Sequence, residues 1–273
     1  MANSINKLID DKIIKRGKTG LLIRLDDIHV QEGFNKRIDD ERTQAADDDL
    51  FNHLFQGKPV PPLEVRPRDD GGVWIVEGHR RHRAYLRCRD AGKPAEWVAI
   101  MPFTGSDVER IARIMNSNSQ LSLTPYEQSR VVKELAGFNL PPDEIAALVG
   151  KSRTTVDKLL ALSQTNHDVQ TLVKDGSVAV DAALERVKEH GESAGKVLAS
   201  DVEKARVQGK KKVTKSVISR EFSAKKARRL CELLYDAAPM TREEGDVLLL
   251  AKGTREEINA ILNEYRQLDG EAK

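Results

Sequence analysis

The sequence predicts an α+β protein, with a small mixed-sheet domain followed by an all-helical domain and a helical C-terminal region. Short apolar runs separated by Gly, Pro and Asp lie between residues 21 and 103 and are typical of strands. From residue 106 onward the apolar residues recur at helical spacing. Aromatic residues make up only 4% of the 273 residues and charged residues 32%, which disfavours a large β-sandwich.

Composition excludes several classes of protein. The net charge is +2, from 45 Lys and Arg against 43 Asp and Glu, so nucleic-acid contacts would need local basic patches. Cys88 and Cys231 are far apart, which excludes a disulfide framework and a Cys-based zinc site. No run approaches the ~18 apolar residues of a membrane span, and the N-terminus has no apolar signal core. We expect a cytoplasmic protein without membrane contact.

Changes in composition along the chain indicate five segments. We expect a flexible N-terminal arm (1–20), the mixed-sheet domain (21–105), a helical domain (106–205), a basic linker (206–222) and a helical region (223–273). The stretch 205–230 is rich in Lys and Arg, with Glu221 as its acidic residue. A solvated linker and a contact with the DNA backbone explain it equally well. The apolar faces in the last segment fit either a dimer contact or a self-contained helical bundle.

The mixed-sheet domain contains four predicted strands, at residues 21–25, 63–66, 73–76 and 97–100. The sequence Asp69-Asp70-Gly71-Gly72 predicts a hairpin, because a Gly pair tolerates the positive φ of tight turns. A helix is expected at 80–91. Three consecutive acids, at 47–49, are interpreted as the start of a helix rather than a metal site.

Residues 141–162 predict a helix-turn-helix. Pro141 and Pro142 end the preceding element, and Asp143 and Glu144 fall in the first turn of the first helix, where the helix dipole favours anions. Gly150 permits the positive φ of the turn, and Ser152 can cap the second helix. Residues at the start and on the exposed side of the second helix could contact bases or phosphates in the major groove. These candidate DNA contacts are Lys151, Ser152, Arg153, Thr154, Thr155 and Lys158. The alternative is an ordinary helical hairpin without a DNA role.

A second motif, the Arg box, is the string Gly78-His79-Arg80-Arg81-His82-Arg83-Ala84 between a strand and a helix. A Gly-led turn at a helix N-terminus exposes backbone N–H groups, and nearby guanidiniums supplement them in binding phosphate. The alternative is a solvated Arg cluster. The string resembles the GERRxRA box of the ParB/RepB/KorB family of DNA-partition proteins, with His79 in the place of the usual Glu.

Other segments resemble the same family in the same order. They are Asn35-Lys36-Arg37, the stretch from Leu50 to Arg66, and Leu123-Thr124-Pro125-Tyr126-Glu127 before the helix-turn-helix. The resemblance covers roughly residues 21–190 and implies a ParB-like nucleotide-binding domain at 21–105. It further implies a dimeric clamp that binds CTP and Mg²⁺, recognises a palindromic site on double-stranded DNA, and hydrolyses CTP slowly.

Carried onto this chain, the resemblance assigns nucleotide contacts to Arg37, Gly78, His79, Arg80, Arg81, Arg83, Asn116, Ser117 and Gln120. Asn116 stands where the family has a Glu that helps to bind Mg²⁺, and an amide is a poorer ligand for that hard cation than a carboxylate. We therefore expect nucleotide binding and leave the hydrolysis of CTP open. The residue that would act as catalyst is unknown.

Three functional hypotheses follow. The first is a CTP-responsive DNA clamp in plasmid, phage or chromosome partition, or in associated gene regulation. The second is a helix-turn-helix transcriptional repressor with a degenerate nucleotide pocket. A ParB-like nuclease ranks third, because the Arg box supplies no clustered carboxylates for a metal. A ParA-type ATPase is a further possible partner, although residues 15–22 only partly resemble its docking motif and fit a flexible basic arm better.

Overall fold

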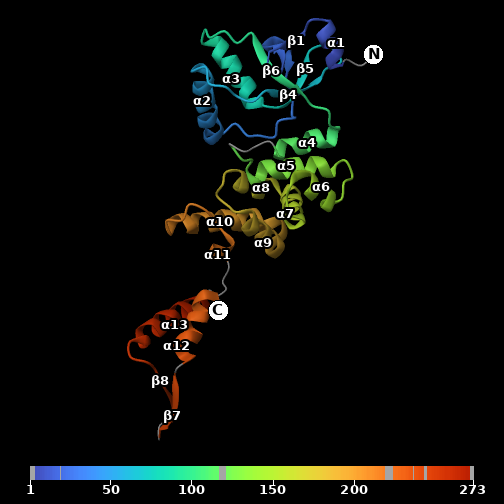
Figure 1. Cartoon of the computed structure of the whole chain (residues 1–273). Coiled ribbons are helices and arrows are strands. Elements are labelled where there is room, and N and C mark those ends of the chain that lie inside the picture. The colour runs from blue at the N-terminus through green and yellow to red at the C-terminus, as the bar shows by residue number, and fades with distance from the viewer. Residues whose placement is uncertain are drawn as a thin grey trace. The chain divides into compact units, whose positions relative to one another are not determined.

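The computed structural model describes residues 4–18, 20–116, 121–218, 224–235, 237–242 and 245–270. The chain divides into two compact units, Met1–Thr214 and Lys215–Lys273 (Figure 1). Among the described residues, no helix is long and apolar enough to cross a membrane.

The first unit begins with a six-stranded mixed sheet. Its strands are β1 (Ile14–Gly17), β2 (Gly20–Arg24), β3 (Ile28–His29), β4 (Leu63–Pro67), β5 (Val73–Glu77) and β6 (Trp97–Pro102). Their order is β1-β2-β6-β4-β5-β3, with β4 parallel to β6, β3 parallel to β5, and the other neighbours antiparallel. Three helices accompany the sheet: α1 (Ile5–Asp10), α2 (Glu41–Phe55) and α3 (His79–Asp90). A 3-10 turn, Leu25–Asp27, connects β2 and β3.

The four strands predicted from sequence are confirmed. Alternating apolar residues of β2, β4 and β5 form the core, where Ile23, Leu63 and Ile75 are fully buried. The predicted hairpin joins β4 and β5, and Gly71 and Gly72 both have positive φ, of 95° and 66°. This hairpin places the end of β5, and therefore the Arg box, beside the start of β4.

The expectation of a flexible arm at residues 1–20 is wrong for the part that the structure describes. Ser4 caps α1 by accepting the N–H of Lys7, and β1 pairs with β2. Leu8 and Ile14 are each only 1% exposed, in the same core as the sheet. The sequence did not predict α1 and β1, because charged residues between the apolar positions obscure their spacing.

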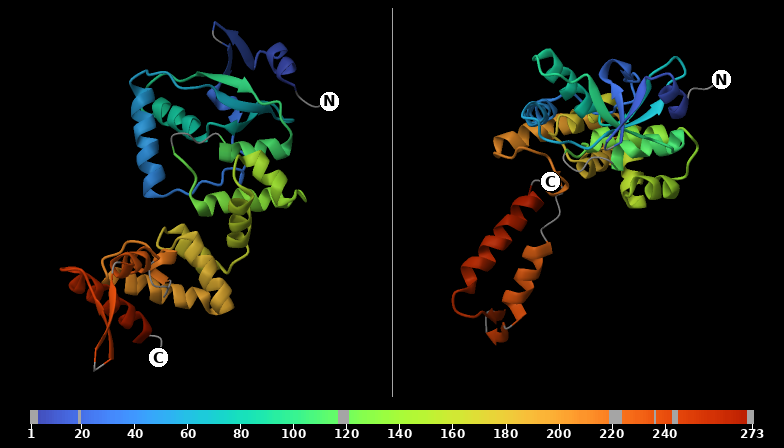
Figure 2. Two further views of the ribbon diagram at one scale, coloured as in Figure 1. Left: turned by 60° about the horizontal axis from the view of Figure 1, so that its bottom comes forward. Right: turned by 45° about the horizontal axis from the view of Figure 1, so that its top comes forward.

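The expectation that a helix starts at residues 47–49 is also wrong. Helix α2 begins earlier, at Glu41, and the carboxylate of its N-cap, Asp40, accepts the N–H of Thr43 at 2.7 Å. The acidic triplet therefore lies in the middle of α2. Asp47 and Asp48 are accommodated there because they face arginines of α3, which packs beside α2 (Figure 2).

The rest of the first unit is helical. Its helices are α4 (Asp107–Asn116), α5 (Pro125–Ala136), α6 (Pro142–Val149), α7 (Arg153–Ser163), α8 (His167–Lys174), α9 (Val180–His190) and α10 (Ala194–Val207), with a 3-10 turn at Gly191–Ser193. The predicted start of α5 is confirmed, with Pro125 in the first turn and a reciprocal capping box between Thr124 and Glu127. Helices α4 to α7 share one core with Phe34 of the sheet domain.

The predicted linker 206–222 is wrong at its beginning. Helix α10 continues to Val207, and Val213 is fully buried and bridges to Val178. Residues up to Thr214 therefore pack into the first unit. Residues 219–222 lie outside the described part of the chain.

The second unit contains the expected helices and a hairpin that the sequence did not predict. Its elements are α11 (Lys215–Ile218), α12 (Ala224–Tyr235), β7 (Ala238–Arg242), β8 (Gly245–Leu249) and α13 (Thr254–Gly270). Strands β7 and β8 are antiparallel. Arg229 of α12 donates to Glu257 of α13 at 2.8 Å, and Ile258 and Ile261 are buried. Pro239 within β7 obscured the strand pattern.

Candidate functional site

Helices α6 and α7 form the predicted helix-turn-helix. Asp143 and Glu144 lie in the first turn of α6, where the helix dipole favours anions. Gly150 ends α6 with φ 63°, and Ser152 caps α7 by accepting the N–H of Thr155. The turn at Gly150 and the cap at Ser152, both predicted from sequence, are thus confirmed.

The buried face of this motif fixes which side of α7 reaches solvent. Ile145 and Val149 of α6 and Val156 and Leu159 of α7 are between 0% and 4% exposed in the helical core. The opposite side of α7 is exposed. The candidate DNA contacts found exposed are Lys151, Ser152, Arg153, Thr154 and Lys158.

Thr155 differs from the other candidate contacts. It is half-buried, and its hydroxyl lies 2.9 Å from that of Ser152 within the helix cap. A hydroxyl engaged in a cap is poorly placed to contact a base edge. Thr155 is therefore a weaker candidate for a DNA contact than the five exposed residues.

The exposed cations on α7 are held by exposed carboxylates. Arg153 donates to Asp143 at 2.7 Å, with side chains 61% and 64% exposed, and Lys158 pairs with Asp181 of α9 at 2.6 Å. Ion pairs this exposed contribute about 0–1 kcal/mol, because water and salt screen them. A DNA phosphate can therefore replace either carboxylate at small cost.

The Arg box begins where β5 turns into α3. Gly78 has φ 102° at the N-cap, and a Cβ there would lie 2.6 Å from Cδ2 of Leu63, so only glycine fits. His79 follows, with its ring 5.9 Å from that of Phe34. Burial of this ring, followed by the nearby charge of Arg83, lowers the pKa of His79 to about 4, so His79 is neutral near pH 7.

The guanidiniums of the Arg box bind groups of the chain itself. Arg80 donates through Nε to Asp47 at 2.6 Å, and Arg83 donates through Nη2 to the other oxygen of the same carboxylate at 2.6 Å. Arg81 donates to the carbonyls of Pro61 and Pro62, each at 2.6 Å, and to Glu77. The three arginines that the resemblance assigns to phosphates are thus engaged within the fold.

The remaining predicted nucleotide residues fall in two places. Arg37 donates to the carbonyl of Leu121 at 2.8 Å. Burial lowers the pKa of Arg37, and the nearby charge of Arg80 in the Arg box lowers it further. Asn116 instead donates to the carbonyl of Leu148 on α6 at 2.8 Å. Ser117 and Gln120 lie outside the described residues.

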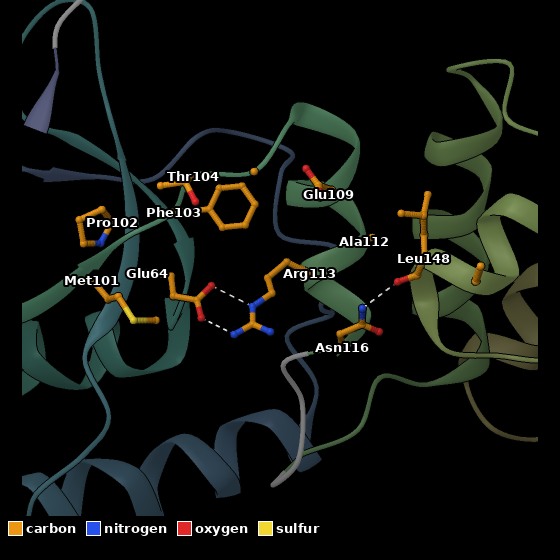
Figure 3. A pocket seen from close by; sticks show the side chains of 12 residues that line it. Glu64, Met101, Pro102, Phe103, Thr104, Glu109, Ala112, Arg113, Asn116 and Leu148 are labelled. Carbon is orange, nitrogen blue, oxygen red and sulfur yellow. Dashed lines mark hydrogen bonds and ion pairs between the residues drawn. The ribbon is translucent and has the colours of Figure 1, made fainter.

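Asn116 lines a pocket of about 580 Å³ between the sheet, α4 and α6 (Figure 3). Glu64 of β4 forms a two-point ion pair with Arg113 of α4 there, with Nε to Oε2 at 2.8 Å. The hydrogen bonds with Glu64 raise the pKa of Arg113. Sequence analysis missed this pair, although a Glu between the apolar Leu63 and Val65 of a predicted buried strand was a signal for it.

The described residues do not gather the ligands of a metal ion. No group of three or more His, Cys, Asp or Glu side chains lies close enough together among them. At Asn116, the predicted metal position, the side chain is an amide whose nitrogen is bonded to α6. The carboxylates that line the same pocket are already held, Glu64 by Arg113 and Glu109 by Ser106. The donor set there does not fit Mg²⁺.

Residues 122–208 match a family model described as the ParB HTH domain. A probable chromosome-partitioning protein ParB of Vibrio cholerae is 29% identical over 216 residues, 78% of this chain and 68% of that protein. The chromosome-partitioning protein Spo0J of Thermus thermophilus is 31% identical over 135 residues, 50% of this chain and 48% of that protein. The chain thus spans about half to two thirds of the length of these curated relatives.

Two crystal structures of C-terminally truncated ParB from Caulobacter crescentus also match. One, complexed to the centromeric parS site, covers 69% of this chain and 92% of that chain, with 23% identity and a TM-score of 0.47. The other, complexed with CTP-gamma-S, covers 65% and 97%, with 24% identity and a TM-score of 0.31. The helix-turn-helix on α6 and α7 falls inside the segment that matches the ParB HTH domain model, and the chain is similar in sequence to chromosome-partitioning proteins named ParB and Spo0J.

Proposed function

We propose that this protein binds a specific site on double-stranded DNA through α7 and acts in DNA partition or in associated gene regulation. One observation carries the proposal: the turn at Gly150 presents a helix whose buried side is apolar and whose opposite side exposes Arg153, Thr154 and Lys158. A helix presented in this way fits the major groove. The names of the relatives, which are partition proteins, support the same function.

Selection from a pool of random duplexes, followed by fluorescence anisotropy on the selected duplex, tests DNA recognition. Arg153→Ala should cost about 1–3 kcal/mol of discrimination if Arg153 reads a base, or weaken binding to all duplexes evenly if it contacts phosphate. Arg89→Ala is the matched control, because Arg89 is an exposed arginine of α3 paired with Asp26. Failure to enrich any sequence would contradict site-specific recognition, and a palindromic selected site would indicate a homodimer.

We also propose that the Arg box, with Arg37, binds a nucleotide triphosphate. The support is chemical: Gly78 places the N-terminus of α3 at the end of β5, and Arg80, Arg81 and Arg83 lie within its first turns. Such a donor set suits polyphosphate, and the Caulobacter crescentus ParB complexed with CTP-gamma-S makes CTP the first nucleotide to test. Bound nucleotide would supply negative charge that Arg80 and Arg83 now receive from Asp47. Because the Asn116 site does not fit Mg²⁺, no hydrolysis step is proposed.

A second candidate function is a helix-turn-helix regulator without nucleotide control. One observation favours it: Asp47 occupies both Arg80 and Arg83. Calorimetric titration of CTP into the full chain, with and without the selected duplex, separates the two candidates. Binding that disappears in Arg81→Ala supports a nucleotide-responsive protein. Unchanged DNA retention and no heat of binding at millimolar CTP leave the simple regulator.

A further inference from the structure

Two guanidiniums of the Arg box share the carboxylate of Asp47, which lies on α2. The side chain of Asp47 is 14% exposed and accepts from two guanidiniums, through Oδ1 from Arg80 and through Oδ2 from Arg83. Nε of Arg83 donates to the same Oδ2 at 3.1 Å. Paired guanidiniums around one oxyanion are the arrangement in which proteins bind phosphate.

An apolar cluster also joins α2 to α3, apart from this contact. Leu54 of α2 is buried in one apolar cluster with Ala84 and Cys88 of α3, and this cluster holds the two helices together. Next to Asp47, Asp48 pairs with Arg87 at 2.8 Å, with side chains 63% and 44% exposed. The acidic face of α2 therefore contains one exposed pair outside the Arg box and one half-buried contact inside it.

Arg80 is directed entirely toward α2. Besides its bond to Asp47, it donates through Nη2 to the carbonyl of Ala46 at 2.5 Å, and its side chain is 16% exposed. The edge of the guanidinium that carries Nε and Nη2 is thus occupied. An incoming phosphate gains a two-point contact with that edge only if both Asp47 and the carbonyl of Ala46 release it.

The charges favour such an exchange for a polyvalent anion. Two guanidiniums share one carboxylate, and Arg37 adds positive charge near the same groups. A single carboxylate leaves this cluster positive, whereas a triphosphate carries several negative charges. A monovalent anion gains nothing over Asp47, since it brings no more charge and must be ordered at the site.

We propose that Asp47 is an intramolecular competitor of the triphosphate for Arg80 and Arg83, and that it sets the affinity and the polyphosphate selectivity of the Arg box. The inference rests on the proposed nucleotide site and adds a residue to it that lies outside the Arg box. It assigns Asp47 an inhibitory role, since a residue that merely oriented the guanidiniums would strengthen binding.

Calorimetric titration of CTP, and separately of inorganic triphosphate, into the full chain tests the inference. Asp47→Asn keeps the shape and removes the charge, and we expect both ligands to bind about tenfold more tightly, a change of about 1.4 kcal/mol. Asp48→Asn is the matched control and should stay within about twofold of the unaltered protein, because Asp48 binds only outside the Arg box. Phosphate alone should show a smaller gain than triphosphate.

The outcomes separate this inference from the proposed function. Equal or weaker triphosphate binding by Asp47→Asn overturns the competitor role and leaves the nucleotide site standing. Absence of binding in every form removes both. Hydrogen exchange on the unaltered protein gives a test without substitution: displacement of Asp47 predicts faster amide exchange in α2 when triphosphate binds, and slower exchange there would overturn it.

Discussion

Arg80 and Arg83 at the start of α3 share a carboxylate that is 14% exposed, whereas Arg153 and Lys158 of α7 pair with carboxylates that are 64% and 56% exposed. The same residue types thus meet acids in two environments. On α7 the pairs contribute little and can be exchanged for DNA phosphates. In the Arg box Asp47 and Arg80 are largely shielded from water, although Arg83 is 42% exposed, so replacing the acid favours a ligand with more charge. Burial, rather than the presence of a carboxylate, distinguishes the two regions.

The largest expected effect tests the claim that a buried carboxylate contributes more than an exposed one, and Glu127 is the residue to change. It is fully buried, and it accepts the N–H groups of Ile38 and Thr124, each at 2.7 Å. Glu127→Ala should lower the free energy of unfolding by about 3–5 kcal/mol, because both donors and Arg42 lose their acceptor. Urea unfolding followed by circular dichroism measures the loss. Glu144→Ala, at an exposed position of α6, should change stability little, and equal losses would contradict the argument from burial.

His79 tests whether the Arg box excludes water. Its pKa is about 4 in the folded chain against an ordinary 6.5, so the unfolded chain binds the extra proton between these values. Stability should therefore be full above pH 6.5 and fall by about 2–3 kcal/mol as the pH drops toward 4. Urea unfolding across this range measures the slope. His79→Gln should weaken the dependence of the free energy of unfolding on pH. An unchanged pH dependence would show that water reaches the ring of His79.

Gly150 tests the geometry that presents α7. Its φ is 63°, and a Cβ there would meet its nearest neighbour at an uncrowded 3.9 Å, so only the backbone penalises a side chain. Gly150→Ala should cost about 1–2 kcal/mol of stability, and Gly150→Asn should cost less, since Asn tolerates left-handed backbone. Thermal unfolding compares the two variants. An Ala variant as stable as the Asn variant would contradict a strained turn.

The smallest effects are expected at the exposed pairs. Asp143→Asn and Asp181→Asn should each change the free energy of unfolding by less than about 1 kcal/mol, because their partners stay hydrated. The affinity for DNA should rise roughly twofold to fivefold at low salt. The reason is that Arg153 and Lys158 no longer have to release a carboxylate before they contact a phosphate. Anisotropy titrations at two salt concentrations measure this. A loss of affinity would indicate that the carboxylates orient the cations.

Local signals in the sequence predicted the elements that depend on local rules. Gly150, Ser152 and Pro125 each act through the backbone of their own turn, and the structure places all three as expected. The strands at 63–66 and 73–76 followed from apolar spacing and from the Gly pair between them.

Long-range pairings could not be predicted in the same way. Asp47 meets Arg80 and Arg83 across two helices, and no spacing rule joins residues more than thirty positions apart. The resemblance identified the Arg box but gave no sign that the chain supplies its own anion there. Glu64 and Arg113 likewise became partners only once α4 had packed against the sheet.

The bridge between Val178 and Val213 has a practical consequence for dividing the chain. Val213 is fully buried, and its carbonyl accepts the N–H of Ala179 at 2.8 Å. A fragment cut after residue 208 would leave a hole beside Val178 and an amide without its acceptor. A fragment that stops at Thr214 keeps Val213 packed against Val178, and it is the suitable fragment to prepare for crystallisation with a DNA duplex.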